Sequence, residues 1–184
     1  MLRTKGKEWT QSKRKTFPMK SQLRSFPLKE LKDNTFVFTV SENFEYLIKF
    51  HLSQFHLPAS IQDIHLYEFS FVARNKPDQA ISHIVNEKIR NTIFEAVDYF
   101  ISRTDAVLVF ICDSSDRRDL VRYKLFTERW YHVAIDQYTV EMVHRVIEDQ
   151  ELGDVYYTGV LMKKDFEYYD ELIDEFGDIK ILNK

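Results

Sequence analysis

Charged and hydroxyl side chains gather immediately after an apolar run that ends in Cys112. The cluster consists of Asp113, Ser115, Asp116, Arg117, Arg118 and Arg122. Carboxylates can hold Mg²⁺, and arginines bind phosphate or carboxylate groups with bidentate geometry. The same residues could instead begin a helix, with Ser115 or Asp116 as the cap and Asp119 paired with Arg122. The cluster is therefore a candidate binding site, and helix capping is the alternative.

Signatures of known catalytic and metal sites are missing from the rest of the sequence. The four glycines stand at positions 6, 153, 159 and 177, so no Gly-x-Gly-x-x-Gly or Walker loop can be written. The six histidines include no helically spaced pair beside a glutamate, which is the usual zinc pattern. Cys112 ends a strand-like apolar run, where a thiol packs as a small hydrophobe. We predict no catalytic residue, no metal and no cofactor.

Composition places the chain among ordinary globular proteins. It has 184 residues, of which 44% are apolar and 30% charged. A single cysteine cannot form an intrachain disulfide, which favours a reducing compartment. No apolar run approaches the roughly 18 residues that a membrane span needs. We expect a cytoplasmic protein that makes no membrane contact.

Charge divides the chain near residue 33. Residues 1–33 hold ten basic and three acidic residues, a net charge of +7, so the remainder carries -10 of the overall -3. We interpret residues 1–33 as a largely irregular basic arm and residues 34–184 as one domain. Such an arm can contact a polyanion or stay solvated. The expected partner is another protein or a second copy of the chain, with nucleic acid as a possible contact of the arm.

Hydrophobic periodicity supplies the elements that position the cluster. Alternation predicts three antiparallel strands, over 34–40, 44–52 and 64–73. Spacing of three and four then predicts a long helix from about 75 to 100, with Asn75 as its cap. The all-apolar run 106–112 predicts a central strand covered on both faces. The segment 138–149 fits both helical spacing and alternation, and its β-branched residues favour a strand. A helix to about 131, this strand, a strand over 155–164 and a last helix after Asp165 complete the order β-β-β-α-β-α-β-β-α. The fold class is α+β with a mixed, mostly antiparallel sheet.

The segment VFICDSSDRRDLVRYKLFTERW and the long helix entered through NKPDQAI resemble an uncharacterised bacterial family, a domain of unknown function. In that family a strand ending in Cys-Asp leads to a helix with the pattern Arg-x-x-Leu-Phe-x-x-x-Trp. The pattern here is formed by Arg122, Leu125, Phe126 and Trp130. The resemblance spans residues 34 to about 176 and implies no established activity.

The order of elements is also similar to that of acetyltransferases of the Gcn5-related kind. This resemblance implies that Tyr123 falls near the tyrosine acid of that family, and that the acyl-CoA pyrophosphate binds between the third strand and the long helix. Those enzymes have a glycine-containing loop there, whereas this chain has Arg74-Asn75-Lys76-Pro77-Asp78. Proline and bulky residues remove an N–H donor and hinder close backbone approach. A non-catalytic binding module is therefore the first hypothesis, and an acyl-CoA-dependent N-acetyltransferase-like enzyme is the alternative.

Overall fold

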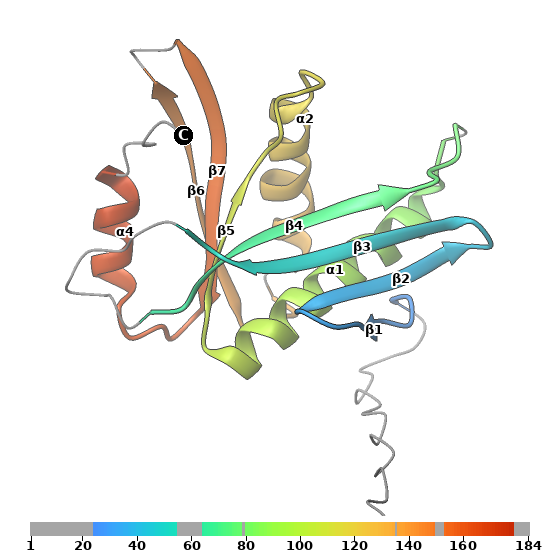
Figure 1. Cartoon of the computed structure of the whole chain (residues 1–184), viewed down its shortest axis with the longest axis horizontal. Helices are drawn as coiled ribbons and strands as arrows, with labels where there is room; N and C mark the ends of the chain where they lie inside the picture. The colour runs from blue at the N-terminus through green and yellow to red at the C-terminus, as the bar shows by residue number, and fades with distance from the viewer. Residues whose placement is uncertain (1–23, 55–63, 79, 135, 150–152, 179–184) are drawn as a thin grey trace, which may run out of the picture.

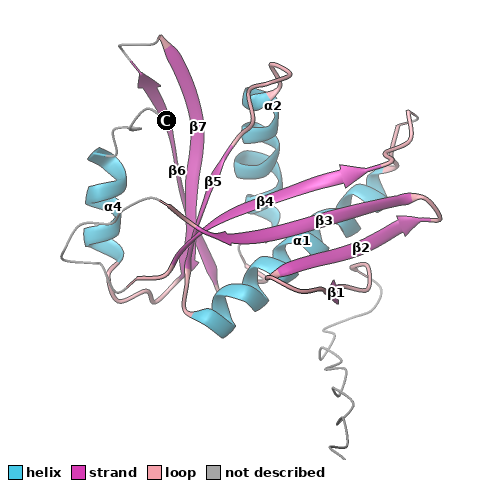
Figure 2. Cartoon of the chain, viewed as in Figure 1, coloured by secondary structure: helices cyan, strands magenta, loops and turns pink. Residues whose placement is uncertain are grey.

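A computed structural model describes residues 24–54, 64–78, 80–134, 136–149 and 153–178. This part of the chain forms one seven-stranded sheet with strand order β1-β2-β3-β4-β5-β7-β6 (Figure 2). The strands are β1 (Lys29–Glu30), β2 (Thr35–Ser41), β3 (Phe44–Leu52), β4 (Leu66–Arg74), β5 (Val107–Ile111), β6 (Val140–Asp149) and β7 (Asp154–Lys163). Neighbouring strands are antiparallel except β4 and β5, which are parallel.

Helices cover both faces of the sheet unequally. They are α1 (His83–Thr104), α2 (Asp119–Lys124), the π-helix η2 (Leu125–Tyr131), α3 (His132–Ala134) and α4 (Tyr169–Asp178). Helices α1 and η2 pack on one face and share the larger core cluster with β2 to β5. Helix α4 packs on the other face over β5 and β7, beside the first residue of β4. Figure 1 shows that the corresponding face of β2, β3 and β4 has no helix over it. The predicted α+β class and order of elements are confirmed, with β1 as an additional short strand.

The side chains explain why these strands form. In β3, Ile48 and Phe50 alternate with the less buried Lys49 and His51, and the buried residues face α1. The Phe50 ring stacks on Phe100 of α1 with ring centroids 4.1 Å apart. Strand β5 is buried on both faces, with Leu108 and Phe110 in the larger cluster and Val107 and Val109 in the smaller one. The predicted central strand is therefore correct.

The long helix begins later than the sequence predicts. Ser82 is its cap, and the Ser82 hydroxyl accepts a hydrogen bond from Val85 N–H. Asn75, the predicted cap, has φ 52° and belongs to a loop after β4. Because Ile84 lies in the first turn and is 67% exposed, the apolar stripe starts one turn further along the helix.

Residues just before the predicted domain boundary pack on the folded body. The Phe26 N–H donates to Thr92 Oγ1 of α1 at 2.8 Å, and the Phe26 ring stacks on Phe38. Asn91 Nδ2 donates to the carbonyl of Arg24 at 2.9 Å. Strand β1 pairs with β2. The body therefore includes residues 24–33, which the boundary at Asn34 leaves out, while the predicted arm over residues 1–23 lies outside the described residues.

Candidate functional site: a gap between β4 and β5

The sheet opens between its two parallel strands. Strands β4 and β5 pair through three residue pairs, Leu66 with Val107, Tyr67 with Leu108 and Glu68 with Val109. Beyond Glu68, β4 runs on to Arg74 and turns away from β5, so that the two strands form a V (Figure 1). The closed end of the V lies at Glu68 and Val109. The open end lies between the loop after β5 and the loop after β4.

Main-chain polar groups line both sides of this gap. His65 C=O accepts from Val107 N–H of β5, whereas Leu66 C=O accepts from Ser53 N–H on the β3 side. Because main-chain direction alternates along a strand, the odd-numbered residues of β4 face β5. Phe71 and Ala73 therefore point their N–H and C=O groups into the gap.

The same alternation applies to β5. Cys112 N–H donates to Tyr157 C=O of β7, so the even-numbered residues face β7 and Ile111 faces the gap. Within the described chain, no strand pairs with β4 beyond Glu68 on this side. The gap therefore offers main-chain donors and acceptors on both walls.

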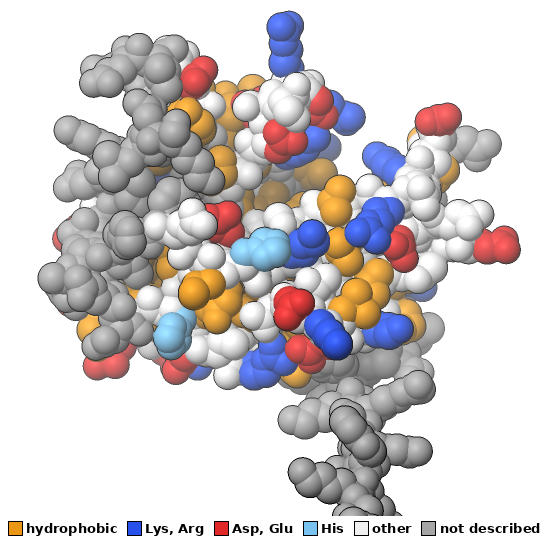
Figure 3. Space-filling model, viewed as in Figure 1, with side chains coloured by type: hydrophobic (Ala, Val, Ile, Leu, Met, Phe, Trp, Pro, Cys, Tyr) orange, Lys and Arg blue, Asp and Glu red, His pale blue; other side chains and the backbone are white. Residues whose placement is uncertain are grey.

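Aromatic side chains close the face of the gap that lies over η2. The Phe126 ring of η2 lies between the two walls, with centroids 5.9 Å from Phe71 of β4 and 5.0 Å from Phe110 of β5. Trp130 stacks on the outer side of Phe71 at 6.0 Å. The space-filling view shows a recess with apolar side chains at its base between the loop after β5 and the end of β4 (Figure 3). The gap therefore has a polar backbone rim and an apolar base.

The π-helical turn sets which side chain faces the gap. Its wider spacing buries Phe126, Trp130 and Tyr131 together. The hydroxyl of Tyr123, the expected acid, is instead hydrogen-bonded with His144 Nδ1 on β6 at 2.6 Å, and its ring contacts the Tyr157 ring. The side chain placed between Phe71 and Phe110 is thus Phe126, which has no proton to give.

A separate hollow of about 390 Å³ lies between the loop after β4 and the start of α1. It is lined by Lys76, Pro77, Asp78, Ala80, Ile81 and Asn86. The first turn of α1 contains no acidic residue, so its main-chain N–H groups favour an anion. Pro77 lacks an N–H and Asp78 is negative, and both weaken that preference.

The predicted polar cluster lies in the loop between β5 and α2 and is largely satisfied by its own members. Asp113 accepts hydrogen bonds from Ser115 N–H and Ser115 Oγ, both at 2.9 Å. Arg122 binds both carboxylate oxygens of Asp116, at 2.6 and 2.7 Å, and also donates to Asp113 C=O at 2.8 Å. The bonds from Ser115 lower the pKa of Asp113, and the bond from Arg122 lowers the pKa of Asp116.

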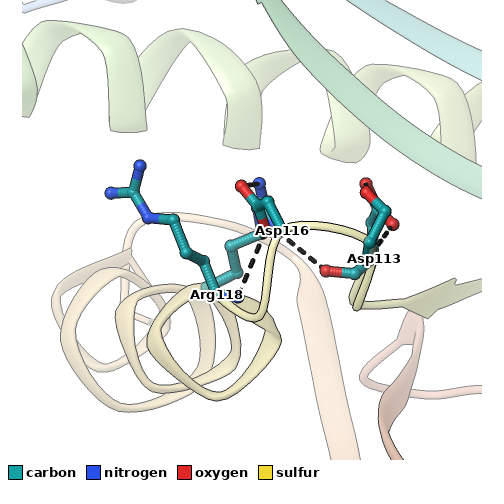
Figure 4. A network of polar contacts seen from close by, with 5 residues as sticks. Asp113, Asp116 and Arg118 are labelled. Atoms are coloured by element: carbon teal, nitrogen blue, oxygen red, sulfur yellow. Dashed lines mark hydrogen bonds and ion pairs between the residues drawn. The ribbon is translucent and has the colours of Figure 1, made fainter.

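The two remaining arginines of the cluster lie apart from these contacts. Figure 4 shows the Arg118 side chain directed away from the Asp116 carboxylate, while Arg118 N–H donates to Asp116 Oδ1 at 3.2 Å. Arg117 has φ 59° and lines a separate hollow with Tyr156 and Tyr157. The structure therefore brings together Asp113, Ser115, Asp116 and Arg122. It also differs from the capping alternative, because α2 begins at Asp119 without a side-chain cap.

Sequence reasoning missed the contact between Tyr123 and His144. The residues lie on a helix and on a strand, 21 positions apart, and no motif links them. Burial raises the pKa of the Tyr123 hydroxyl and lowers the pKa of His144, so burial favours the neutral form of both groups. Burial likewise raises the pKa of the Cys112 thiol to about 11, which keeps this thiol protonated at neutral pH.

Comparison with known protein families gives a match. A family model described as a family of unknown function, DUF6169, matches residues 85–178, which comprise most of α1 and everything from β5 to α4. No curated protein matches the chain. Among the described helices, none is both long and apolar enough to cross a membrane. Because the match covers just over half of the sequence, the chain belongs to the DUF6169 family, which confirms the predicted resemblance to a domain of unknown function.

Proposed function

We propose that this domain is a binding module that takes a ligand of the acyl-coenzyme A type in the gap between β4 and β5. The observation that carries the proposal is the unpaired main chain of Phe71, Ala73 and Ile111 along an apolar base. Phe71 and Ala73 are half-buried and Ile111 is 44% exposed. Amide groups of a ligand can pair such main-chain groups in place of water. The ligand would thus extend along β4 like an additional strand.

The shape of the gap favours a thin, uncharged chain. It closes at Glu68 and Val109, so a bound chain must end there or leave the plane of the sheet. The charged end of a peptide would be costly beside Phe110 and Phe126, which are both buried. The pantetheine arm of coenzyme A is linear and uncharged and carries two amides, so it suits both the rim and the base.

The phosphate end of such a ligand would lie in the hollow between the loop after β4 and the start of α1. Lys76 supplies a cation there, and the N-terminus of α1 supplies main-chain N–H groups. The order of elements agrees with this placement, since the acetyltransferases that it resembles bind pyrophosphate between the corresponding strand and helix. Pro77 and Asp78 predict weaker binding than a glycine-containing loop would give.

The proposal is for binding rather than group transfer. Phe126 occupies the position beside the gap where a side-chain acid would be useful, and Tyr123 is engaged by His144. Glu68 lies at the closed end opposite His51 of β3, on the uncovered face of the sheet. These two residues are the ones to examine first if turnover is detected.

The test is a thermal melt with and without acetyl-coenzyme A. Ligand at a hundred times its Kd adds about 2.7 kcal/mol, and in a domain of this size that raises Tm by roughly 5–10 °C. Ala73→Pro removes an N–H that faces the gap but leaves the β3–β4 ladder intact, so it should abolish the shift without lowering the ligand-free Tm. Ala73→Val keeps the N–H and is the matched control. An unchanged wild-type Tm at millimolar acetyl-coenzyme A would exclude the proposal.

A protein partner is the second candidate. The observation that favours it is a row of apolar residues, Val37, Leu47 and Val72, that lie opposite one another on the uncovered face of β2, β3 and β4. Val72 is 52% exposed whereas Leu47 is only 5% exposed, so the row is open to a partner at Val72. The nucleic-acid contact predicted for the basic arm mostly concerns residues outside the described chain and stays a prediction.

A further inference from the structure

Among the described residues, strand β6 ends the sheet, and no other strand pairs with its outer edge. It pairs with β7 through ten residue pairs from Val140 to Asp149, and it is the last strand in the order of the sheet. Soluble proteins usually shield such edges with charges, bulges or covering segments, because unpaired strands associate. The edge of β6 is therefore a surface where another strand can pair.

The hydrogen bonds show which residues form this edge. Thr139 C=O accepts from Lys164 N–H, so the odd-numbered residues point toward β7. Met142 N–H instead donates to the Tyr131 hydroxyl at 2.9 Å, so the even-numbered residues point outward. Tyr131 thereby covers the first part of the edge. The outward main chains that follow belong to His144, Val146 and Glu148.

This short edge is complementary to itself. If two copies pair antiparallel about a two-fold axis at Val146, then His144 of each copy lies opposite Glu148 of the other, and Val146 lies opposite Val146. All three residues point outward, so each opposed pair exchanges two main-chain hydrogen bonds. Val146 is 47% exposed and available for this contact.

The contact with Tyr123 prepares His144 for that role. The Tyr123 hydroxyl lies 2.6 Å from Nδ1, and we assign it as the donor, which puts the proton of the neutral ring on Nε2. That N–H is a suitable donor for a carboxylate such as Glu148 of a second copy. A positive side chain opposite His144 would instead leave both donors without an acceptor.

We propose that the chain forms a closed two-fold dimer through antiparallel pairing of β6 with β6 of a second copy, centred on Val146. This surface lies two strands away from the gap between β4 and β5, so dimerisation and ligand binding are separate properties. The two-fold pairing uses the β6 edge of each copy and predicts two copies and no more.

The decisive experiment is light scattering of the full chain over a range of concentrations. We expect a mass of about 44 kDa, twice the 22.1 kDa of one copy. Val146→Pro removes an outward N–H without touching the β6–β7 ladder, so it should give a 22.1 kDa species with an unchanged circular dichroism spectrum. Val146→Thr keeps the N–H and is the control. A wild-type chain that stays monomeric, a larger oligomer, or a dimer that survives Val146→Pro would each overturn the proposal.

A charge exchange tests the register and remains informative if Val146→Pro fails to fold. Glu148→Lys alone and His144→Glu alone each place unsuitable partners opposite one another, and each should weaken the dimer about tenfold. When the two variants are mixed, the carboxylate introduced by His144→Glu in one copy faces the ammonium group introduced by Glu148→Lys in the other. The other opposed pair joins Glu148 of the His144→Glu copy to His144 of the Glu148→Lys copy, as in the wild type. A heterodimer should therefore form. Single variants that dimerise as tightly as the wild type, or a mixture that dimerises no more tightly than either variant alone, would contradict this register.

Discussion

A methyl group added at Gly159 would test the packing that holds the gap open. Gly159 of β7 lies opposite Phe110 of β5 and His144 of β6. A Cβ at this position would stand 2.6 Å from two carbons of the Phe110 ring and 2.9 Å from the Val143 carbonyl oxygen. Real Cβ atoms do not approach so closely, so either the ring or strand β6 must shift in Gly159→Ala.

The cost can be estimated from these contacts. The Phe110 ring is held against Phe126 at 5.0 Å, and Val143 C=O belongs to a main chain that pairs with β7, so neither group yields freely. Overpacking of this kind costs about 1–3 kcal/mol, and the lower chain entropy of alanine returns about 0.4–1 kcal/mol. We expect the free energy of unfolding to fall by about 1–2 kcal/mol and Tm by about 2–8 °C, measured by urea and thermal denaturation.

Two comparisons make this prediction specific. Gly153→Asn is the control, because Gly153 has φ 71° and no neighbour within 4 Å, and asparagine tolerates that conformation. It should change stability by less than about 0.5 kcal/mol. In a Phe110→Leu background, Gly159→Ala should cost less than in the wild type, because the closest contact is gone. An equal cost in both backgrounds, or a stable Gly159→Ala protein, would refute the account of Phe110.

Two further predictions concern titratable side chains. Burial lowers the pKa of His144, and the bond from Tyr123 also favours its neutral form. Tyr123→Phe should therefore raise this pKa toward 6.5 in an NMR titration; an unchanged value would contradict the assigned donor. The unfolded chain protonates His144 at a higher pH than the folded chain does. The free energy of unfolding should therefore fall as pH drops through 6.5, and this fall should be smaller in Tyr123→Phe. With its pKa at about 11, Cys112 should react with iodoacetamide at pH 8 more than about a hundredfold slower in the folded chain than in urea.

Side-chain periodicity was sufficient to predict most of the fold. Alternation identified β3 because one set of residues must reach α1 while the other faces water, and the continuous apolar run identified β5 because helices cover both of its faces. The β-branched composition correctly assigned β6 as a strand although its spacing also fitted a helix. These patterns indicate which side chains are buried, because each buried position carries an apolar residue.

The start of α1 and the geometry of η2 needed information that periodicity does not carry. Asn75 and Ser82 are both good caps, and the choice between them depends on a left-handed residue and a proline in the intervening loop. The π-helical turn depends on how Phe126, Trp130 and Tyr131 share the core with β4 and β5. Both features follow from tertiary packing rather than from local propensity.

The candidate site was predicted only in part. The polar cluster after β5 does bring Asp113, Asp116 and Arg122 together, but these groups satisfy one another within the loop. The main-chain groups in the gap could not be found from the sequence, because every residue has the same N–H and C=O. Only the hydrogen bonds of His65 and Leu66 show which of them lack a strand partner.

Core packing explains why the gap stays open when no ligand is present. Two parallel strands that begin as a pair would gain hydrogen bonds by continuing together, so something must hold Phe71 and Phe110 apart. The Phe126 ring lies between them and is itself stacked on Phe94 of α1, which keeps it from moving aside. Closing the gap would require this buried ring to leave the core, at a cost of several kcal/mol that two or three hydrogen bonds cannot offset. Under the proposed function, a ligand would meet a site that is already formed, and its amide groups would add hydrogen bonds without a prior change in the sheet.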